Sequence, residues 1–316
     1  MLKQLASLTL VVPCYNEEEI LPISIIKFVS ILNDLIRLEL VNYESKILFI
    51  DDGSRDKTWQ LIEKYCNEYN CINGLKLSRN FGHQNALLAG LMSCDTDITV
   101  SIDADLQDDP QVIKDMIDAY YNGSEIVFGV RSDRSSDSFS KRFFAQSFYK
   151  VMNKMGLDLI EDHADFRLMS KKSLNALGDY KEINLFLRGL IPTLGFKTKK
   201  VFYVRLAREA GVSKYNLKKM LALALNGVTA FSVVPLIFII WVGIFISLIS
   251  GLFGVWALIE KFFIGGAIQG WTSIVVPMFF LGGIQLFTLG IIGIYISKVY
   301  LEVKSRPRYI IEDEIK

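Results

Sequence analysis

The sequence predicts an α/β domain with a mostly parallel sheet, followed by helices that lie on and in a membrane. Short apolar runs alternate with helix-like segments over the first two thirds of the chain, which is typical of parallel sheets. The last third contains two long segments without an acidic or basic side chain. At 316 residues and 51% hydrophobic content, the chain is larger and more apolar than one ordinary soluble domain. A formal net charge of +1 argues against a nucleic-acid partner.

Polar clusters follow four of the predicted strands. The strands are expected at Leu8–Val12, Ile47–Ile50, Gly74–Leu77, Ile98–Ile102 and Ile126–Phe128. Helical periodicity is found at Glu18–Leu38, Thr58–Tyr69, Gln84–Met92 and Pro110–Tyr121. The polar clusters are Pro13–Glu19, Asp51–Ser54, Ser78–Gly82 and Asp103–Gln107. Because ligands of parallel sheets bind beyond the carboxyl ends of the strands, these clusters predict a binding site at that edge.

The fourth cluster contains two carboxylates separated by one residue, Asp103 and Asp105. Such a pair suits Mg²⁺ or Mn²⁺, which take oxygen ligands and leave coordination positions for substrate phosphates. Paired aspartates are also common in surface turns, but the neighbouring polar clusters favour a site. The sequence has no G-x-x-x-x-G-K-[ST] loop and no G-x-G-x-x-G loop after the first strand. Phosphates are therefore expected to be bound through a metal and through side chains.

The C-terminal third is predicted to be a membrane hairpin. No acidic or basic residue occurs between Met220 and Ile259 or between Phe262 and Ser297. A bilayer core of about 30 Å requires roughly 20 apolar residues in a helix, so two spans are predicted, at 231–258 and 272–297. Lys and Arg flank both outer ends, which predicts that the α/β domain and both termini lie in the cytoplasm. The hairpin is expected to anchor a multi-pass protein of the inner (cytoplasmic) membrane.

The predicted domains follow from these features. Residues 1–212 form a cytoplasmic domain, 213–230 a juxtamembrane amphipathic helix, 231–298 the two transmembrane helices, and 299–316 a cytoplasmic tail. In segment 138–155, apolar side chains recur at helical spacing with basic residues between them. That segment is predicted either to lie in the membrane interface or to pack on the sheet, and the pattern leaves both open. Four cysteines without metal-ligand spacing fit a reduced, cytosolic setting.

Three motifs, Val11–Glu18, Ile50–Asp56 and Asp103–Asp108, together resemble those of family 2 glycosyltransferases with the GT-A fold. Further motifs are similar to those of polyprenyl-phosphate glycosyltransferases: Asn80–Gly82, Arg131–Arg134, Asp165–Ser170, Ser213–Tyr215 and Arg306–Tyr309. Within that group the chain looks most like the bactoprenol (undecaprenyl-phosphate) glucosyltransferases. The resemblance covers nearly the whole chain and implies a GT-A nucleotide-sugar-binding domain joined to the interfacial and transmembrane helices. The motifs are more specific for the family than for the sugar.

The resemblance implies a role for each motif residue. The uridine pocket is expected to be lined by Pro13, Tyr15, Glu17 and Asp52, with packing at the strand end as the alternative for Tyr15. Asp103 is expected to contact the ribose or the metal, Asp105 to bind the metal, and Gln107 to complete its coordination. The acceptor phosphate is expected to be bound by Arg131, Arg134, Arg205, Ser213 and Lys214. For Arg134 the alternative is attraction to anionic headgroups.

The role of Asp165 stays open at this stage. Related transferases place a base at this position, whereas with a phosphate acceptor the carboxylate would bind sugar hydroxyls or orient an arginine. His83 and His163 have no ligand spacing and are expected to be ordinary residues at the edge of the site.

The expected function is inverting transfer of a hexose, glucose by resemblance, from a UDP-sugar to undecaprenyl or another polyprenyl phosphate at the cytoplasmic membrane face. Transfer of another sugar, of the GlcNAc, mannose or aminoarabinose type, is one alternative. A non-catalytic UDP-sugar-binding partner of a flippase is another. A processive polysaccharide synthase is disfavoured because the chain lacks Q-x-x-R-W. The expected partners are the UDP-sugar, the polyprenyl phosphate and membrane lipids. A homo-oligomer is compatible with the sequence.

Overall fold

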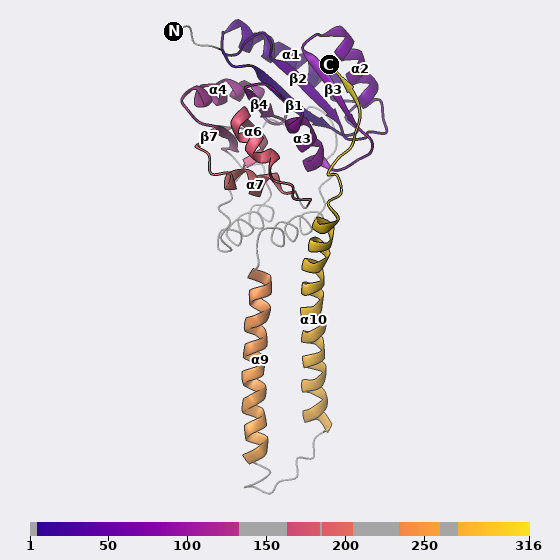
Figure 1. The fold of residues 1–316 in the computed structure, drawn as a ribbon, viewed down its shortest axis with the longest axis vertical. Coiled ribbons are helices and arrows are strands. Elements are labelled where there is room, and N and C mark those ends of the chain that lie inside the picture. The colour runs from indigo at the N-terminus through magenta and orange to yellow at the C-terminus, as the bar shows by residue number, and fades with distance from the viewer. Residues whose placement is uncertain (1–4, 133–162, 184, 205–233, 260–270) are drawn as a thin grey trace. The chain divides into compact units, whose positions relative to one another are not determined.

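A computed structural model describes residues 5–132, 163–183, 185–204, 234–259 and 271–316 (Figure 1). The chain divides into two compact units. The first contains Met1–Leu221 together with Arg306–Lys316, and the second contains Ala222–Ser305. The first unit is therefore an α/β domain to which both ends of the chain contribute, and the described part of the second unit consists of two long helices.

An eight-stranded sheet in the order β7-β5-β6-β4-β1-β2-β3-β8 forms the centre of the α/β unit. Its strands are β1 Leu8–Cys14, β2 Lys46–Asp51, β3 Ile72–Leu77, β4 Ile98–Ser101, β5 Ile126–Arg131, β6 His163–Ser170, β7 Thr198–Tyr203 and β8 Ile311–Ile315. Parallel pairs join β1 to β2 and β4, β2 to β3, and β5 to β7, whereas β6 and β8 are antiparallel to their neighbours. The predicted mostly parallel sheet is confirmed, and all five predicted strands are present.

Strand β6 runs against the strands on either side of it. Arg167 pairs with Ser101 of β4, and His163 pairs with Val130 of β5. The amino end of β6 therefore lies at the edge of the sheet where the parallel strands end. This reversal brings Asp165, near the start of a strand, to the same edge as the polar clusters that follow the other strands.

Helices cover both faces of the sheet. They are α1 Leu21–Arg37, α2 Thr58–Glu68, α3 His83–Met92, the 3₁₀ helix η1 Pro110–Val112, α4 Ile113–Tyr121, α6 Lys171–Gly178 and α7 Leu187–Thr193. Side chains of α1, α2 and α4 share one hydrophobic core with inward residues of the sheet. On the opposite face α3 packs so closely that a Cβ on Gly90 would lie 2.6 Å from Val11 and Ile50. The four predicted helical segments are confirmed, with ends shifted by a few residues.

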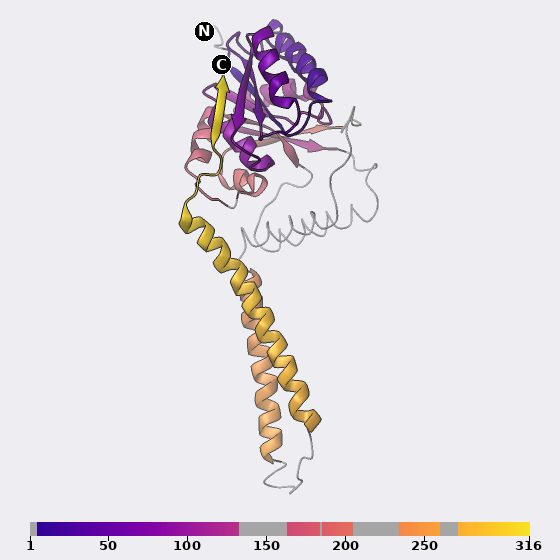
Figure 2. The same cartoon turned by 90° about the vertical axis from the view of Figure 1, so that its right-hand side faces the viewer.

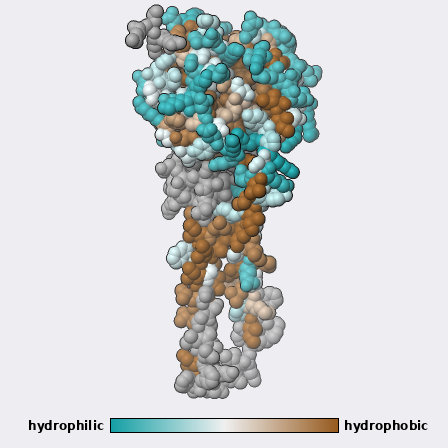
Figure 3. Space-filling model, viewed as in Figure 1, coloured by the Kyte–Doolittle hydropathy of each residue, from teal (hydrophilic) through white to brown (hydrophobic). Residues whose placement is uncertain are grey.

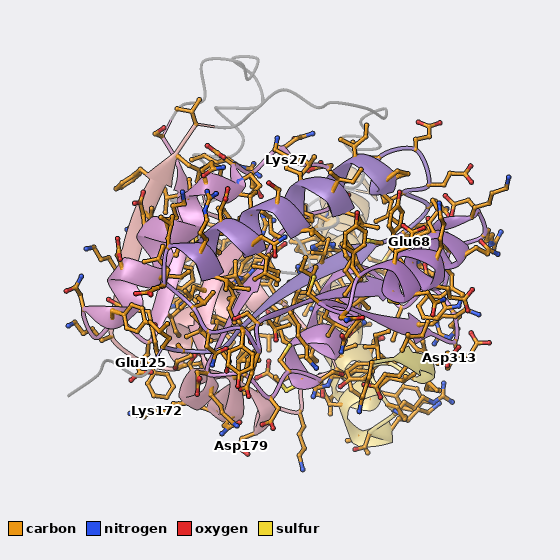
Figure 4. All side chains as sticks on the ribbon, turned by 90° about the horizontal axis from the view of Figure 1, so that it is seen from above. Lys27, Glu68, Glu125, Lys172, Asp179 and Asp313 are labelled. Atoms are coloured by element: carbon orange, nitrogen blue, oxygen red, sulfur yellow. The ribbon has the colours of Figure 1, made fainter. Side chains whose placement is uncertain are left out.

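The spacing of apolar residues explains how α1 packs. Its buried side chains include Leu21, Ile25, Phe28 and Leu32, which recur every three or four residues and so form one stripe. A proline at the start of the helix fits the first turn, where a backbone N–H has no partner within the helix. Many charged side chains lie around the outside of the unit. Figure 4 labels Lys27, Glu68, Glu125, Lys172, Asp179 and Asp313 there.

The segment after the second unit returns to the sheet. β8 pairs antiparallel with β3 at the sheet edge (Figure 2). The N–H of Ser78 donates to the carbonyl of Ile310 at 3.0 Å, and the guanidinium of Arg308 donates to the carbonyl of Tyr180 at 2.7 Å. The segments that precede and follow residues 222–305 therefore belong to the same folded unit.

The second unit contains α9, Val234–Ile259, and α10, Trp271–Lys304, which contact each other. In the described part of the chain, the stretch Phe280–Lys304 is long and apolar enough to cross a membrane by length and composition, and Leu236–Ile246 is a shorter apolar stretch. Large apolar side chains are exposed along both helices, for example Trp241 at 65% and Leu286 at 72% (Figure 3). The predicted pair of membrane spans stays a prediction.

We expect the turn at Gly53 to tolerate no side chain. Gly53 has φ +65, and a Cβ there would lie 2.4 Å from the carbonyl carbon of Arg79. Gly195 supplies a matched control, since it has φ +73 with nothing within 4 Å of the added Cβ. Gly53→Ala should lower the free energy of unfolding by about 3 kcal/mol, and Gly195→Ala by about 1 kcal/mol. Denaturant unfolding in detergent measures both losses, and equal losses would contradict the steric argument.

Candidate active site

The loops after β1 and β2 are joined by hydrogen bonds. The N–H of Asn16 donates to Oγ of Ser54 at 2.9 Å, and the amide oxygen of Asn16 accepts from the N–H of Arg55 at 2.9 Å. The N–H of Glu17 donates to Oγ1 of Thr58 at 2.9 Å. Asn16 reaches this arrangement with φ 52, a conformation that asparagine adopts more readily than most residues. Asn16 and Glu17, which belong to the first polar cluster, therefore hold the loops after β1 and β2 together.

Pro13 lies inside β1 opposite Ile50 of β2. Its missing N–H is tolerated in this central strand because the pairing of β1 with β4 ends at Val11 and Ser101. Tyr15 follows in the loop and is half-buried. The residues that follow Pro13, including Tyr15, therefore lie at the edge of the sheet where β1 ends.

Asp52 connects β2 to the start of α3. Its side chain is nearly buried at 2% exposure, and its two oxygens accept from the N–H groups of Phe81 at 2.7 Å and Gly82 at 3.0 Å. Desolvation raises the pKa of Asp52, and these hydrogen bonds act to lower it. Asp52 therefore fixes the loop that precedes α3, a contact that the expected uridine role does not require.

The paired aspartates lie in a tight turn after β4. The N–H of Gln107 donates to Oδ1 of Asp105 at 3.2 Å. Leu106, which separates Asp105 from Gln107 in the chain, has φ 56. Asp103 and Asp105 are half-buried, and Gln107 is 6% exposed. Among the described residues, no group of three or more His, Cys, Asp or Glu side chains is placed to hold a metal ion. The loop itself contains the carboxylates of Asp103 and Asp105 and the amide of Gln107, and each of these groups has an oxygen atom that can bind a cation.

Asp165 makes several ion pairs and hydrogen bonds at this edge of the sheet. Its side chain is 5% exposed and makes an ion pair with Arg167. Arg188 from α7 donates to both of its oxygens, at 3.3 and 3.0 Å. His83, the first residue of α3, places Nε2 at 3.3 Å from Asp165 and at 3.7 Å from Asp103. Gln84 donates to the same carboxylate at 3.4 Å.

These contacts set the charges of Asp165, His83 and Asp103. Burial acts to raise the pKa of Asp165, but Arg188, the hydrogen bond from His83 and the charge of Arg167 hold it well below its usual range. Burial acts to lower the pKa of His83, but the hydrogen bond to Asp165 and the charges of Asp103 and Asp165 raise it to about 9. Desolvation raises the pKa of Asp103 to about 6. At neutral pH the candidate site therefore holds Asp165 as an anion and His83 as a cation.

Arg131 at the end of β5 has two buried partners. Its Nη2 lies 3.5 Å from Oδ1 of Asp108, and its Nε lies 3.4 Å from the hydroxyl of Tyr203. That hydroxyl also donates to Oδ1 of Asp108 at 2.5 Å. The side chain of Arg131 is 26% exposed, so it remains accessible from solvent.

The structure describes some of the predicted site residues and not others. Pro13, Tyr15, Glu17 and Asp52 lie at or after the ends of β1 and β2, Asp103, Asp105 and Gln107 lie after β4, Arg131 ends β5, and Asp165 lies near the start of β6. The other predicted acceptor residues, Arg134, Arg205, Ser213 and Lys214, lie outside the described residues, as do the segments 138–155 and 213–230.

Arg188 and Tyr203 carry no motif signal that would have singled them out. His83, expected at the edge of the site, instead contacts two of its carboxylates.

The family model described as Glycosyl transferase family 2 matches residues 9–178, more than half of the chain. The chain belongs to glycosyltransferase family 2. The uncharacterized glycosyltransferase YkoT of Bacillus subtilis (strain 168) is 49% identical over 310 residues, covering 98% of this chain and 92% of that protein. The bactoprenol glucosyl transferase of Shigella phage SfII is 41% identical over 306 residues, covering 96% of this chain and 97% of that protein. The predicted family resemblance is confirmed, and the chain is a glycosyltransferase.

This family 2 glycosyltransferase has a GT-A-like fold. The crystal structure of mannosyl-3-phosphoglycerate synthase from Rubrobacter xylanophilus is similar to it with a TM-score of 0.50. The match covers 71% of this chain and 72% of the other, at 13% sequence identity. At that identity the likeness concerns the fold alone.

We predict that His83 of this glycosyltransferase stays protonated through neutral pH. Its pKa of about 9 lies above the ordinary 6.5, so its proton should be lost only as the pH rises towards 9. The chain has two histidines, so ¹³C-histidine NMR of metal-free protein can follow both, with His83→Gln assigning the signals. Asp165→Asn should move the titration of His83 towards 6.5. A wild-type His83 that already titrates near 6.5 would show that the ion pairs do not form.

Proposed function

We propose that this glycosyltransferase transfers glucose from UDP-glucose to a polyprenyl phosphate, with inversion at the sugar. The observation that carries the proposal is 41% identity, over 97% of its length, to a bactoprenol glucosyl transferase. Similarity over the whole length supports a shared acceptor as well as a shared catalytic domain. Arg131 and Arg188, which are both partly exposed, suit a phosphate acceptor because guanidinium binds phosphate with two parallel hydrogen bonds.

We assign the donor nucleotide to the edge formed by β1, β2 and β4. Tyr15 would stack on the uracil ring, with Pro13, Glu17 and Asp52 lining the same pocket. Asp103 and Asp105 supply hard oxygen donors in one turn, as Mg²⁺ or Mn²⁺ requires when substrate phosphates complete the coordination. Asp105 and Gln107 would hold that cation, with Asp103 on the cation or the ribose. The bound cation would offset the negative charge of the departing diphosphate.

The proposed reaction is a single displacement. An oxygen of the lipid phosphate attacks the anomeric carbon of glucose from the side opposite the UDP oxygen. The new carbon–oxygen bond forms while the bond to UDP breaks, and the bonding pair leaves on UDP. An α-linked donor thus gives a β-linked product. A phosphate monoester has its second pKa at about 6, so it is largely dianionic near neutral pH and needs no general base.

We therefore assign Asp165 to the positioning of Arg188 and not to proton transfer. Its two oxygens are already engaged by Arg167, Arg188 and His83. A carboxylate whose pKa is held well below its usual range is a poor proton acceptor. Arg188, at 36% exposure, would in turn face a phosphate oxygen of the acceptor. Of the alternatives that the sequence leaves open, the orientation of an arginine fits these contacts best.

We also propose that residues 222–305 cross the membrane twice. β8 pairs with β3, so the chain before and after this segment belongs to one folded sheet. A segment whose two ends belong to one soluble domain crosses a bilayer an even number of times. Helix α9 has 26 residues and α10 has 34, and both exceed the roughly 20 residues that a span requires. The flanking Lys and Arg residues favour a cytoplasmic location for the α/β unit.

The reaction is tested with purified protein, a short polyprenyl phosphate and a panel of UDP-sugars. UDP release should be fastest with UDP-glucose, should require the lipid phosphate and should stop with EDTA. Asp105→Asn should lower kcat/KM at limiting Mn²⁺ by about a hundredfold or more, because one carboxylate ligand of the cation is lost. Asp115→Asn, at an exposed position on α4, is the matched control. UDP release that does not depend on the lipid would contradict the acceptor. Full activity of Asp105→Asn would contradict the metal assignment.

Cysteine labelling tests the double crossing. In a cysteine-free background, Glu68→Cys on α2 and Asp313→Cys on β8 should react with an impermeant maleimide from the same membrane side. Figure 4 labels both side chains at the outside of the α/β unit. Lys261→Cys should react only from the opposite side. Labelling of all three positions from one side would contradict a membrane-crossing hairpin.

A further inference from the structure

The hydroxyl of Tyr203 lies between a carboxylate and a guanidinium. It donates to Asp108 at 2.5 Å and lies 3.4 Å from Nε of Arg131. The same carboxylate oxygen lies 3.5 Å from Nη2 of Arg131, so the three side chains close a triangle. Tyr203 is 4% exposed and Asp108 is 2% exposed. A hydroxyl can donate a hydrogen bond to one partner and accept one from another, whereas a phenylalanine side chain can do neither.

The backbone holds Tyr203 in this place. Tyr203 is the last residue of β7, and the register of the parallel pair sets it opposite Arg131 of β5. Its carbonyl accepts from the N–H of Ser132 at 2.9 Å and from the hydroxyl of Ser132 at 3.0 Å. Its ring meets Phe166 edge-on, with the centroids 5.5 Å apart. The side chain is therefore fixed at both ends, by the sheet and by ring packing.

The three members of the triangle come from different parts of the site. Asp108 lies in the acidic loop after β4, close to Asp105 and Gln107. Arg131 ends β5, on the side that we assign to the acceptor phosphate. A flexible arginine loses considerable side-chain freedom when it binds a ligand in one geometry. Partners that hold the guanidinium before binding reduce that cost and thereby raise the affinity for the ligand.

We infer that Tyr203 and Asp108 are positioning residues that hold Arg131 in the orientation that receives the acceptor phosphate, and that they link it to the donor-side acidic loop. The inference rests on the proposed function, because it requires Arg131 to bind the acceptor. It adds a tyrosine from the edge strand β7 to the acceptor site. A purely structural role for Tyr203 predicts lower stability without a change in acceptor affinity.

Tyr203→Phe separates the two roles, because it keeps the ring against Phe166 and removes the hydroxyl. The KM for a short polyprenyl phosphate should rise about tenfold, while the KM for UDP-glucose and kcat each change less than about twofold. Tyr121→Phe is the matched control, since its half-buried hydroxyl donates to the carbonyl of Leu40 at 3.0 Å. That variant should lose stability to a similar degree and keep the acceptor KM of the wild type. A Tyr203→Phe enzyme with an unchanged acceptor KM would overturn the inference.

A double-mutant cycle with Arg131→Ala shows whether Tyr203 acts through Arg131. If it does, Tyr203→Phe should raise the acceptor KM in the wild-type background and add little in the Arg131→Ala background. Additive effects would overturn the inference while leaving the proposed function intact. If the Arg131→Ala enzyme keeps the wild-type acceptor KM, Arg131 does not bind the acceptor. That result would also overturn the inference. Absence of lipid-dependent transfer in the wild type would instead refute the proposed function.

Discussion

The buried negative charge of Asp165 is the interaction on which the arrangement of the candidate site depends. Arg167 is completely buried, and among the described residues its Nε and Nη1 make no hydrogen bond, so the ion pair with Asp165 is what offsets its desolvation. Arg188 and His83 bond to the same carboxylate. Removing one partner of a buried ion pair commonly costs 3–5 kcal/mol, because it leaves the other charge uncompensated. One anion thereby connects β6, α3 and α7 at the candidate site.

The sequence predicted the parts of the fold that depend on local periodicity. Leu21, Ile25 and Phe28 form an apolar stripe that any helix of that spacing buries, and the runs at β1, β2 and β4 are too apolar to be exposed. The strands that periodicity did not reveal are β6, β7 and β8. β7 is largely exposed and rich in lysine, and β8 is exposed along most of its length. Their pairing partners are distant in the chain, so no local pattern reports them.

The candidate site was predictable where chemistry is concentrated in a short motif, as at Asp103 and Asp105. It was not predictable where a residue acts through a contact made by the fold. His83 showed no ligand spacing, yet the start of α3 brings it to Asp165, whose strand runs antiparallel to its neighbours. Arg188 and Tyr203 lie outside every motif, and only the tertiary arrangement joins them to the acidic residues. Sequence spacing therefore singled out the proposed ligands Asp103 and Asp105, whereas the residues that contact the acidic side chains emerged only from the fold.

The return of β8 to the sheet also determines the order in which the domain is completed. β8 follows α9 and α10 in the chain, so during synthesis β3 remains an unpaired edge until both apolar helices have been made. An open strand edge is a template for pairing with other chains. The newly made chain therefore exposes an aggregation-prone edge until α10 has been made, and pairing of β8 with β3 then closes that edge.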